Sequence, residues 1–335
     1  MATNITVNIA EYVDAEQNLI FLTPDDRVST LSLSMNKIRH IPIVESKELR
    51  KLICVISKVE LRRLKTPPKE QLPVGELILG GLDIEKLYDV VTKTSKQLIK
   101  DAFYQEYFKP DTPQVFSLSV DDKFVEVFKA LVKRDDLGKR PRTLAILSST
   151  NPRPVKSMYS YTDLLRLIAD PKQENDEFLD RDVTSVMTSK VKTFWMMDKV
   201  TDAIDMWCCL PFTHFPLRRS EEEKDTQIDG FIDDMVLSTF DHELINPCAT
   251  EISLSRIAQM CGREGSVGKH NTVTEGDTIR TAISKFINGI ERPTSILVGD
   301  LFPSRDGQSE SCKMKGIVSY VDIFREFAKF VGHEI

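Results

Sequence analysis

One short pattern occurs four times along this chain of 335 residues. Each copy begins with a helix start in which an acidic residue follows the capping position by three residues. An apolar strand, a hairpin and a second apolar strand come next, and the second strand leads into another helix start. A repeat of this kind has to be identified first, because it determines how the sequence divides into structural units. We therefore expect four similar supersecondary units.

The first helix start of each copy has a capping signature. A Ser or Thr at the N-cap, with an acid three residues later, satisfies backbone N–H groups that the helix leaves unpaired. The acid is present in all four copies, and only the third copy lacks the capping hydroxyl. The four pairs are Thr23 with Asp26, Ser119 with Asp122, Trp195 with Asp198, and Thr274 with Asp277.

The first strand of three copies is preceded by an Arg, placed three residues before a Pro or a small residue. The three residues are Arg39, Arg142 and Arg292, and the third copy has Thr213 instead. Nearly continuous apolar runs of this length are typical of buried strands. The Arg residues have two interpretations, because they can be surface residues at strand starts or ligands of an anion.

The second strand ends in Ser-x-x-Asp in two copies. These are Ser160 with Asp163 in the second copy, and Ser319 with Asp322 in the fourth. The first copy has Ser57 with Glu60, and the third has lost the acid, with Val236 in its place. Taken singly, each such pair is a capping box. A constant position after a strand in several copies also favours a ligand role, and the two interpretations are compatible.

Composition limits the class of protein. The 41% apolar and 29% charged residues are typical of a soluble globular protein, and the net charge of −6 argues against nucleic-acid binding. No apolar run approaches the ~20 residues of a membrane helix, and the six cysteines are scattered as in a reducing compartment. We expect a cytoplasmic protein without membrane contact. No catalytic motif, metal-ligand spacing or dinucleotide fingerprint is present.

With these motifs in register, the sequence resembles four repeats of the cystathionine β-synthase (CBS) domain, arranged as two tandem pairs called Bateman modules. Residues 182–188 are similar to the lead-in that often opens such a repeat. The resemblance implies an α/β fold with small sheets packed against helices. It implies a first module at residues 1–172, with repeats at about 12–65 and 111–170 and a helical link at 66–110. The second module is 173–335, with repeats at about 180–242 and 268–333.

In that family, clefts between paired repeats bind adenine nucleotides or S-adenosylmethionine. The hydroxyl and acid of the second helix start hold the ribose, and basic residues near the first strand meet the phosphates. One carboxylate can accept both O–H groups of a ribose diol, and a guanidinium matches phosphate geometry. The nucleotide-binding residues implied are Arg142, Ser160, Asp163, Arg292, Ser319, Asp322, Arg39, Ser57 and Glu60.

The second and fourth copies carry the complete set. Glu60 has a longer side chain than the usual Asp, and Val236 cannot accept a hydrogen bond. We therefore expect one or two good sites, one per module, rather than four.

The four-repeat layout without a catalytic domain is similar to the γ subunit of AMP-activated protein kinase and to stand-alone four-CBS proteins. We expect a non-enzymatic regulatory protein that binds AMP, ADP or ATP, with S-adenosylmethionine as an alternative ligand. It would control a protein partner, such as a kinase, by a conformational switch, as a single chain or as a homodimer. Two other hypotheses remain open: a scaffold that binds no ligand, and a regulatory subunit of a kinase-like complex.

Overall fold

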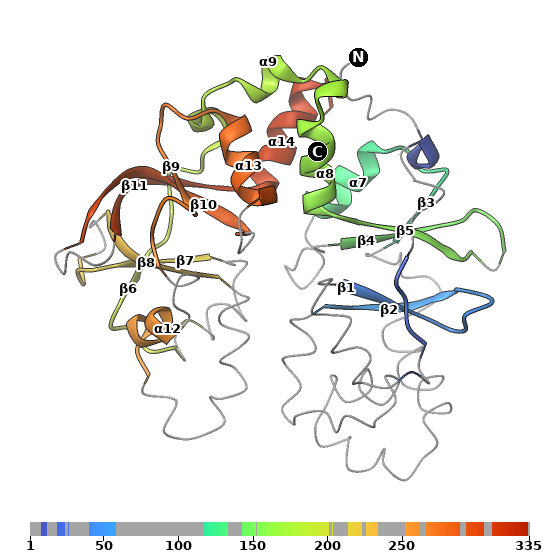
Figure 1. Ribbon diagram of the computed structural model, residues 1–335, viewed down its shortest axis with the longest axis horizontal. Helices are drawn as coiled ribbons and strands as arrows, with labels where there is room; N and C mark the ends of the chain where they lie inside the picture. The colour runs from blue at the N-terminus through green and yellow to red at the C-terminus, as the bar shows by residue number, and fades with distance from the viewer. Residues whose placement is uncertain are drawn as a thin grey trace, which may run out of the picture. The chain divides into compact units, whose positions relative to one another are not determined.

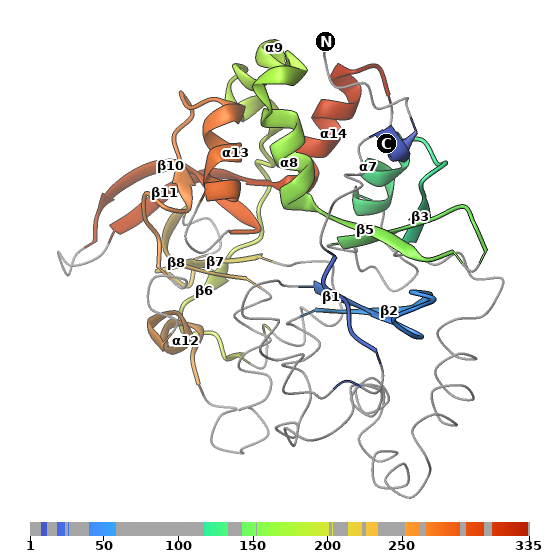
Figure 2. The same cartoon turned by 45° about the vertical axis from the view of Figure 1, so that its right-hand side comes forward.

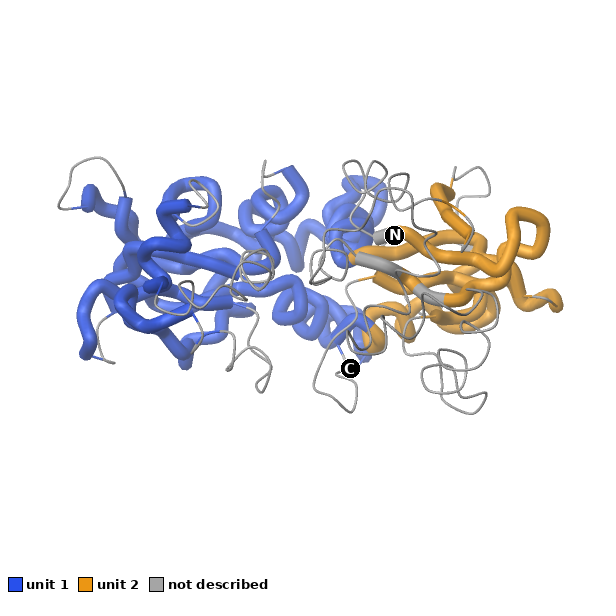
Figure 3. The backbone as a smooth tube through the Cα atoms, turned by 90° about the horizontal axis from the view of Figure 1, so that it is seen from below, with its two compact units in different colours: residues 1–5, 131–140, 161–335 blue, residues 6–130, 141–160 orange. Residues whose placement is uncertain are grey.

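The structure is a computed structural model, and it describes residues 8–11, 19–23, 26, 40–57, 117–132, 143–151, 153–200, 203, 214–222, 226–233, 252–260, 266–288, 293–304 and 310–333. The chain divides into two compact units (Figure 3). Unit 1 holds Met1–Ile5, Leu131–Arg140 and Tyr161–Ile335, and unit 2 holds Thr6–Ala130 and Pro141–Ser160. The helix that starts at Tyr161 thus belongs to unit 1, although the expected module boundary lies at 172. The expected helical link at 66–110 lies outside the described residues.

Unit 2 contains the strands of the first and second repeats. Strands β1 (His40–Val44) and β2 (Leu52–Ser57) form an antiparallel hairpin. Strand β4 (Thr143–Leu147) pairs in parallel with β3 (Ser117–Ser119) and antiparallel with β5 (Val155–Ser160), and helix α7 (Val125–Val132) follows β3. Both hairpins contribute to one buried apolar cluster, which shows that the two repeats pack together. Its members are Val44, Leu52, Ala145, Leu147 and Val155.

Unit 1 contains one six-stranded sheet made by the third and fourth repeats (Figure 1). Its order is β6-β7-β8-β11-β10-β9, and the two repeats join where β8 pairs antiparallel with β11. The third repeat contributes β6 (Phe194–Trp195), β7 (His214–Arg218) and β8 (Gln227–Asp233). The fourth contributes β9 (Thr272–Val273), β10 (Ser295–Pro303) and β11 (Glu310–Ser319).

The hairpin of the fourth repeat differs from the sequence-based expectation. The polar composition of residues 299–313 favours a surface loop, yet β10 continues to Pro303 and β11 begins at Glu310. Polar residues there alternate with buried ones, since Cys312 and Met314 are buried whereas Lys313 is exposed. An alternation of period two is the mark of a strand with one buried face, so the prediction of a loop is wrong for most of this segment.

Helices of unit 1 lie on both sides of its sheet, above it and below it in Figure 1. They are α8 (Tyr161–Ala169), α9 (Asp176–Leu179), α12 (Leu254–Met260), α13 (Ile279–Asn288) and α14 (Tyr320–Phe330). Helix α8 packs against α13, and both views show these two beside α14 (Figures 1 and 2). The apolar faces expected from helical periodicity are confirmed as buried, for example at Ile168, Phe286 and Phe327. This burial holds the helices in place.

Residues 170–177 have a linker composition, but the structure gives them order. They contain the short 3-10 helix η3 (Pro171–Gln173) and the start of α9. Asn175 is only 1% exposed, and its side-chain amide donates to the carbonyl of Ile168 at 3.0 Å. Phe178 follows and packs edge-on against Phe327 of α14. This segment therefore anchors α9 to the helices of unit 1.

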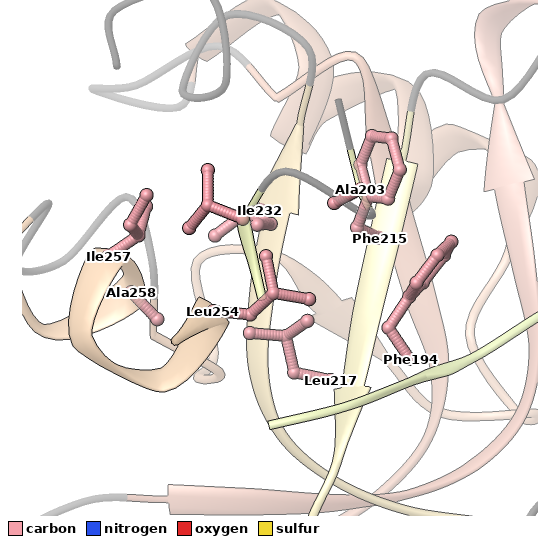
Figure 4. Packing of buried hydrophobic residues seen from close by; sticks show 9 residues of the cluster. Phe194, Ala203, Phe215, Leu217, Ile232, Leu254, Ile257 and Ala258 are labelled. Atoms are coloured by element: carbon pink, nitrogen blue, oxygen red, sulfur yellow. The ribbon is translucent and has the colours of Figure 1, made fainter. Parts of the chain in front are cut away.

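The core of the third repeat lies between its hairpin and α12 (Figure 4). Two phenylalanine rings, Phe194 and Phe215, pack with centroids 4.9 Å apart. Helix α12 covers them and the hairpin with an apolar face, so the short helix is held by tertiary packing rather than by its own propensity. The cluster consists of Phe194, Val200, Ala203, Phe215, Leu217, Ile232, Leu254, Ile257 and Ala258.

Three observations on the described residues concern membrane helices, metal sites and cysteine. None of the helices within them has the length and apolar character needed to cross a membrane. No group of three or more His, Cys, Asp or Glu side chains is placed there to hold a metal ion. Cys312 is a buried free thiol, and burial, with a smaller effect of Asp300, raises its pKa to about 12. This thiol therefore stays protonated at neutral pH.

The lead-in at 182–188 packs against the fourth repeat. It contains the 3-10 helix η4 (Val183–Val186), followed by Met187 and Thr188. Thr188 and Ile317 of β11 exchange two backbone hydrogen bonds, at 2.9 and 3.0 Å. Gly316 permits this approach, because a Cβ at Gly316 would collide with the Met187 side chain and with the Thr188 carbonyl.

We predict that Gly316→Ala lowers the free energy of unfolding by about 1–3 kcal/mol, because the added methyl group overpacks this contact. Urea denaturation measures the change. Gly276→Ala is the matched control, since a Cβ at Gly276 meets nothing within 4 Å. Equal denaturation midpoints for both variants would show that the lead-in does not pack in this way.

Candidate functional site

The four hairpins share one register, which defines equivalent positions in the four repeats. Each first strand has a bulge after its fourth residue, and it begins opposite the last residue of the second strand. Agreement in both features across four hairpins confirms the internal repeat. The opposed pairs are His40 with Ser57, Thr143 with Ser160, His214 with Asp233, and Ser295 with Ser319.

This register changes how the Arg residues align. Arg39 and Arg142 directly precede the opposed pair, whereas in the fourth repeat Thr294 has that place and Arg292 lies two residues earlier. All three Arg residues lie outside the described residues. Their role at a phosphate remains a prediction. Arg292 does not hold the position equivalent to that of Arg39 and Arg142.

All four first helix starts have the predicted carboxylate cap. In each, a carboxylate oxygen accepts the backbone N–H of the residue three positions earlier, at 2.7–2.9 Å. Charge-assisted bonds of this kind are stronger than neutral ones. The third copy keeps the bond to the backbone without a capping hydroxyl. The accepting residues are Asp26, Asp122, Asp198 and Asp277.

The second helix start of the fourth repeat uses the same geometry. Asp322 Oδ2 accepts the Ser319 N–H at 2.8 Å and the Ser319 hydroxyl at 2.6 Å. Ser319 ends β11 and caps α14, so the capping-box interpretation is confirmed for this pair. Both side chains are partly exposed.

The Asp322 carboxylate has one further contact. Its second oxygen, Oδ1, lies 3.3 Å from the hydroxyl of Thr188 in the lead-in. Thr188 is 134 residues away in sequence, and the β-bridge to Ile317 brings it there. The sequence identified the lead-in but not this residue. Asp322 is thus approached from two repeats, because the lead-in opens the third repeat and α14 ends the fourth.

The second repeat presents its acid on a neighbouring helix of unit 1. Asp163 lies in the first turn of α8 with 39% of its side chain exposed, and Arg166 approaches it at 3.4 Å. The rings of Tyr161 and Tyr320 stack with centroids 4.7 Å apart. These tyrosines are the first residues of α8 and α14, so the helix starts that carry Asp163 and Asp322 lie side by side. Ser160 ends β5 and is partly exposed.

In the third repeat, the opposed pair His214 and Asp233 takes part in an internal hydrogen-bond network. The Thr294 hydroxyl lies 2.7 Å from Nε2 of His214 and 3.4 Å from Asp233 Oδ2. Thr294 is 2% exposed, and the His214 ring stacks on Phe231. His214 is therefore a packed residue that joins two repeats. Val236 lies outside the described residues.

The first repeat is the least described. Ser57 ends β2, opposite His40, as the pattern predicts. The Ser57 side chain and Glu60 lie outside the described part of the chain, so the effect of the longer acid remains a prediction.

Residues 9–66 match the CBS domain family. This segment is similar to a CBS domain. The match covers the first repeat, and the common hairpin register extends the same unit to the other three. No curated protein matches the sequence.

Two solved structures of archaeal proteins share the fold. Protein MJ1225 from Methanocaldococcus jannaschii, described as a proposed archaeal homologue of γ-AMPK, has 15% identity and a TM-score of 0.57, covering 96% of this chain and 100% of its own. An uncharacterized conserved protein from Pyrococcus horikoshii has 13% identity and a TM-score of 0.51, with the same coverage of both chains. These similarities confirm the expected α/β CBS-pair fold over nearly the whole chain.

We predict that Thr294→Val lowers the free energy of unfolding by about 1–2 kcal/mol, because a buried hydrogen bond to His214 is lost. A double-mutant cycle with His214→Phe, read by urea denaturation, isolates this bond. The expected coupling is at least about 0.5 kcal/mol. Strictly additive effects would mean that the two side chains do not interact.

Proposed function

We propose that this protein is a non-enzymatic regulator that binds an adenine nucleotide at the Asp322 helix start and alters a protein partner through a conformational shift. Asp322 carries the proposal. A partly exposed carboxylate is supported from two repeats, in a family whose paired repeats bind nucleotides. The carboxylate of Asp277 caps its helix start in the same way, and the Asp322 carboxylate in addition lies 3.3 Å from the Thr188 hydroxyl of the third repeat's lead-in.

Asp322 has acceptor capacity left for a ribose. The cap uses Oδ2, whereas Oδ1 faces Thr188 at 3.3 Å, longer than a usual O–H···O bond. A carboxylate offers about four lone-pair sites, so Oδ1 can accept one or both hydroxyls of a ribose diol. Charge-assisted bonds of this kind contribute roughly 1.5–3 kcal/mol each.

A ligand at Asp322 would also touch two repeats, which supplies the switch. Thr188 belongs to the lead-in of the third repeat, and Ser319 and Asp322 belong to the fourth. A nucleotide that favours one spacing of these segments shifts the population toward that state. Micromolar affinity corresponds to about 8 kcal/mol, so a differential affinity of 1–3 kcal/mol is available for the switch.

The remaining predicted residues complete the proposal. Asp163, with Ser160, would form a second nucleotide site, and Arg39, Arg142 and Arg292 would meet phosphates. Ser57 and Glu60 would make a weaker site. AMP, ADP and ATP are the proposed ligands, with S-adenosylmethionine as the alternative. We place the protein in the cytoplasm, acting on a kinase, on another regulated protein or on a second copy of itself.

We predict that Asp322→Ala abolishes one class of nucleotide site, measured by isothermal titration with AMP, ADP, ATP and S-adenosylmethionine. Asp277→Ala is the matched control, because Asp277 accepts the same two bonds from Thr274, at 2.7 and 2.9 Å. Both substitutions remove a cap and should cost about 0.5–2 kcal/mol of stability. Only the Asp322 variant should lose binding. Equal titrations for the two variants would exclude Asp322 from the site.

We also predict that nucleotide at 100 times its dissociation constant stabilises the wild-type protein by about 2.7 kcal/mol in thermal unfolding. Asp163→Ala should remove a second class of site and leave the first intact. Unchanged melting with all four ligands would instead support the scaffold hypothesis, in which the repeats serve only to give the protein its shape.

A further inference from the structure

Two buried hydroxyl groups in the described part of the chain have no hydrogen-bond partner. They are Oγ1 of Thr143 and Oγ of Ser295. Thr143 is 5% exposed and Ser295 is 0% exposed. Buried polar groups in proteins nearly always have a partner, and one that does not costs free energy, so each such group calls for an explanation.

These two residues hold the same position in different repeats. Thr143 lies opposite Ser160, and Ser295 lies opposite Ser319. Directly opposed residues of antiparallel strands project from the same face of the sheet with their Cβ atoms about 5 Å apart. Each unpartnered hydroxyl therefore lies beside the Ser that precedes a helix. The second and fourth repeats are also the two that keep the complete Ser-x-x-Asp.

The same position is satisfied where the Ser-x-x-Asp is lost. In the third repeat it is His214, whose ring bonds the Thr294 hydroxyl at 2.7 Å. The fold also satisfies a buried serine elsewhere in the same sheet, since Ser311 is 0% exposed and donates to Asp229 Oδ1 at 2.7 Å. The unpartnered hydroxyls are therefore specific to this position in the two repeats with complete helix starts.

We propose that Ser295, and Thr143 at the equivalent position, are additional nucleotide-contacting residues whose hydroxyls bond an oxygen of the ribose–phosphate. This inference rests on the proposed function and extends it to residues that no motif identified. Helix α14 begins next to Ser295, and a helix start of this length favours phosphate oxygens. The ligand would supply the missing partner.

The burial of these hydroxyls links binding to movement. Ser295 is 0% exposed, so a ligand reaches it only when the atoms that cover it move. The conformation that binds nucleotide then differs from the one described here in the surroundings of Ser295. This displacement is the shift that the proposed switch requires.

The test compares the ligand-free stability and the nucleotide affinity of single variants. For Ser295→Ala and Thr143→Val, we expect an unchanged or higher melting temperature without ligand, because an unsatisfied polar group is removed. For Ser295→Ala we expect at least a tenfold loss of AMP affinity by titration. Ser311→Ala is the matched control, and we expect it to lower the melting temperature and leave the affinity unchanged.

Adenosine serves as a second probe alongside AMP. A loss of affinity for AMP alone places the Ser295 bond at the phosphate, and a loss for both places it at the ribose. Unchanged affinity of Ser295→Ala for AMP, with binding by the wild type intact, overturns this inference and leaves the proposed function standing. If the wild-type protein binds neither probe and none of ADP, ATP and S-adenosylmethionine, the proposed function fails, and the inference fails with it.

Discussion

Carboxylate capping of helix starts is the interaction on which the rest of the described structure depends. An Asp three residues into the turn accepts the backbone N–H at the start, and this occurs at Asp26, Asp122, Asp198, Asp277 and Asp322. The bond fixes the direction in which each helix leaves its strand. Together with the bulge that the four hairpins share, this cap gives the repeats the same local geometry. The same kind of site can therefore recur.

The repeat, its capping acids and its apolar faces could be predicted from sequence because they are local. Spacings of three residues for caps, and periods of two and 3.6 for faces, are visible in the chain itself. The alignment of Arg292 was less secure, because only the pairing of Ser295 with Ser319 fixes the register. The loop expected at 299–313 also failed, because its polar residues form the exposed face of an extended hairpin.

The contacts that the sequence did not predict are those between distant segments. Thr188 reaches Asp322 only because the lead-in pairs with β11, and no spacing in the chain encodes that approach. Gly316 is the one sequence sign of this approach that we recognise, since a glycine in a strand often marks a close approach of another backbone. The stack of Tyr161 on Tyr320 likewise depends on the packing of α8 beside α14.

The capping role and the proposed ligand role of Ser-x-x-Asp are therefore compatible. The cap uses one oxygen of Asp322 and orients the other, so the structural role prepares the carboxylate for a ligand. The unpartnered hydroxyls of Thr143 and Ser295 occur beside this arrangement, where a cost in stability accompanies the features expected of a binding site. We propose that another molecule supplies the missing partner of these two hydroxyls.

The most direct test of the account is a crystal structure of the full chain grown with millimolar AMP. The account predicts a nucleotide with its ribose hydroxyls within hydrogen-bond distance of Asp322 Oδ1 and with Thr188 beside it. An empty site under those conditions, with Asp322 bonded only to Ser319 and Thr188, would contradict it.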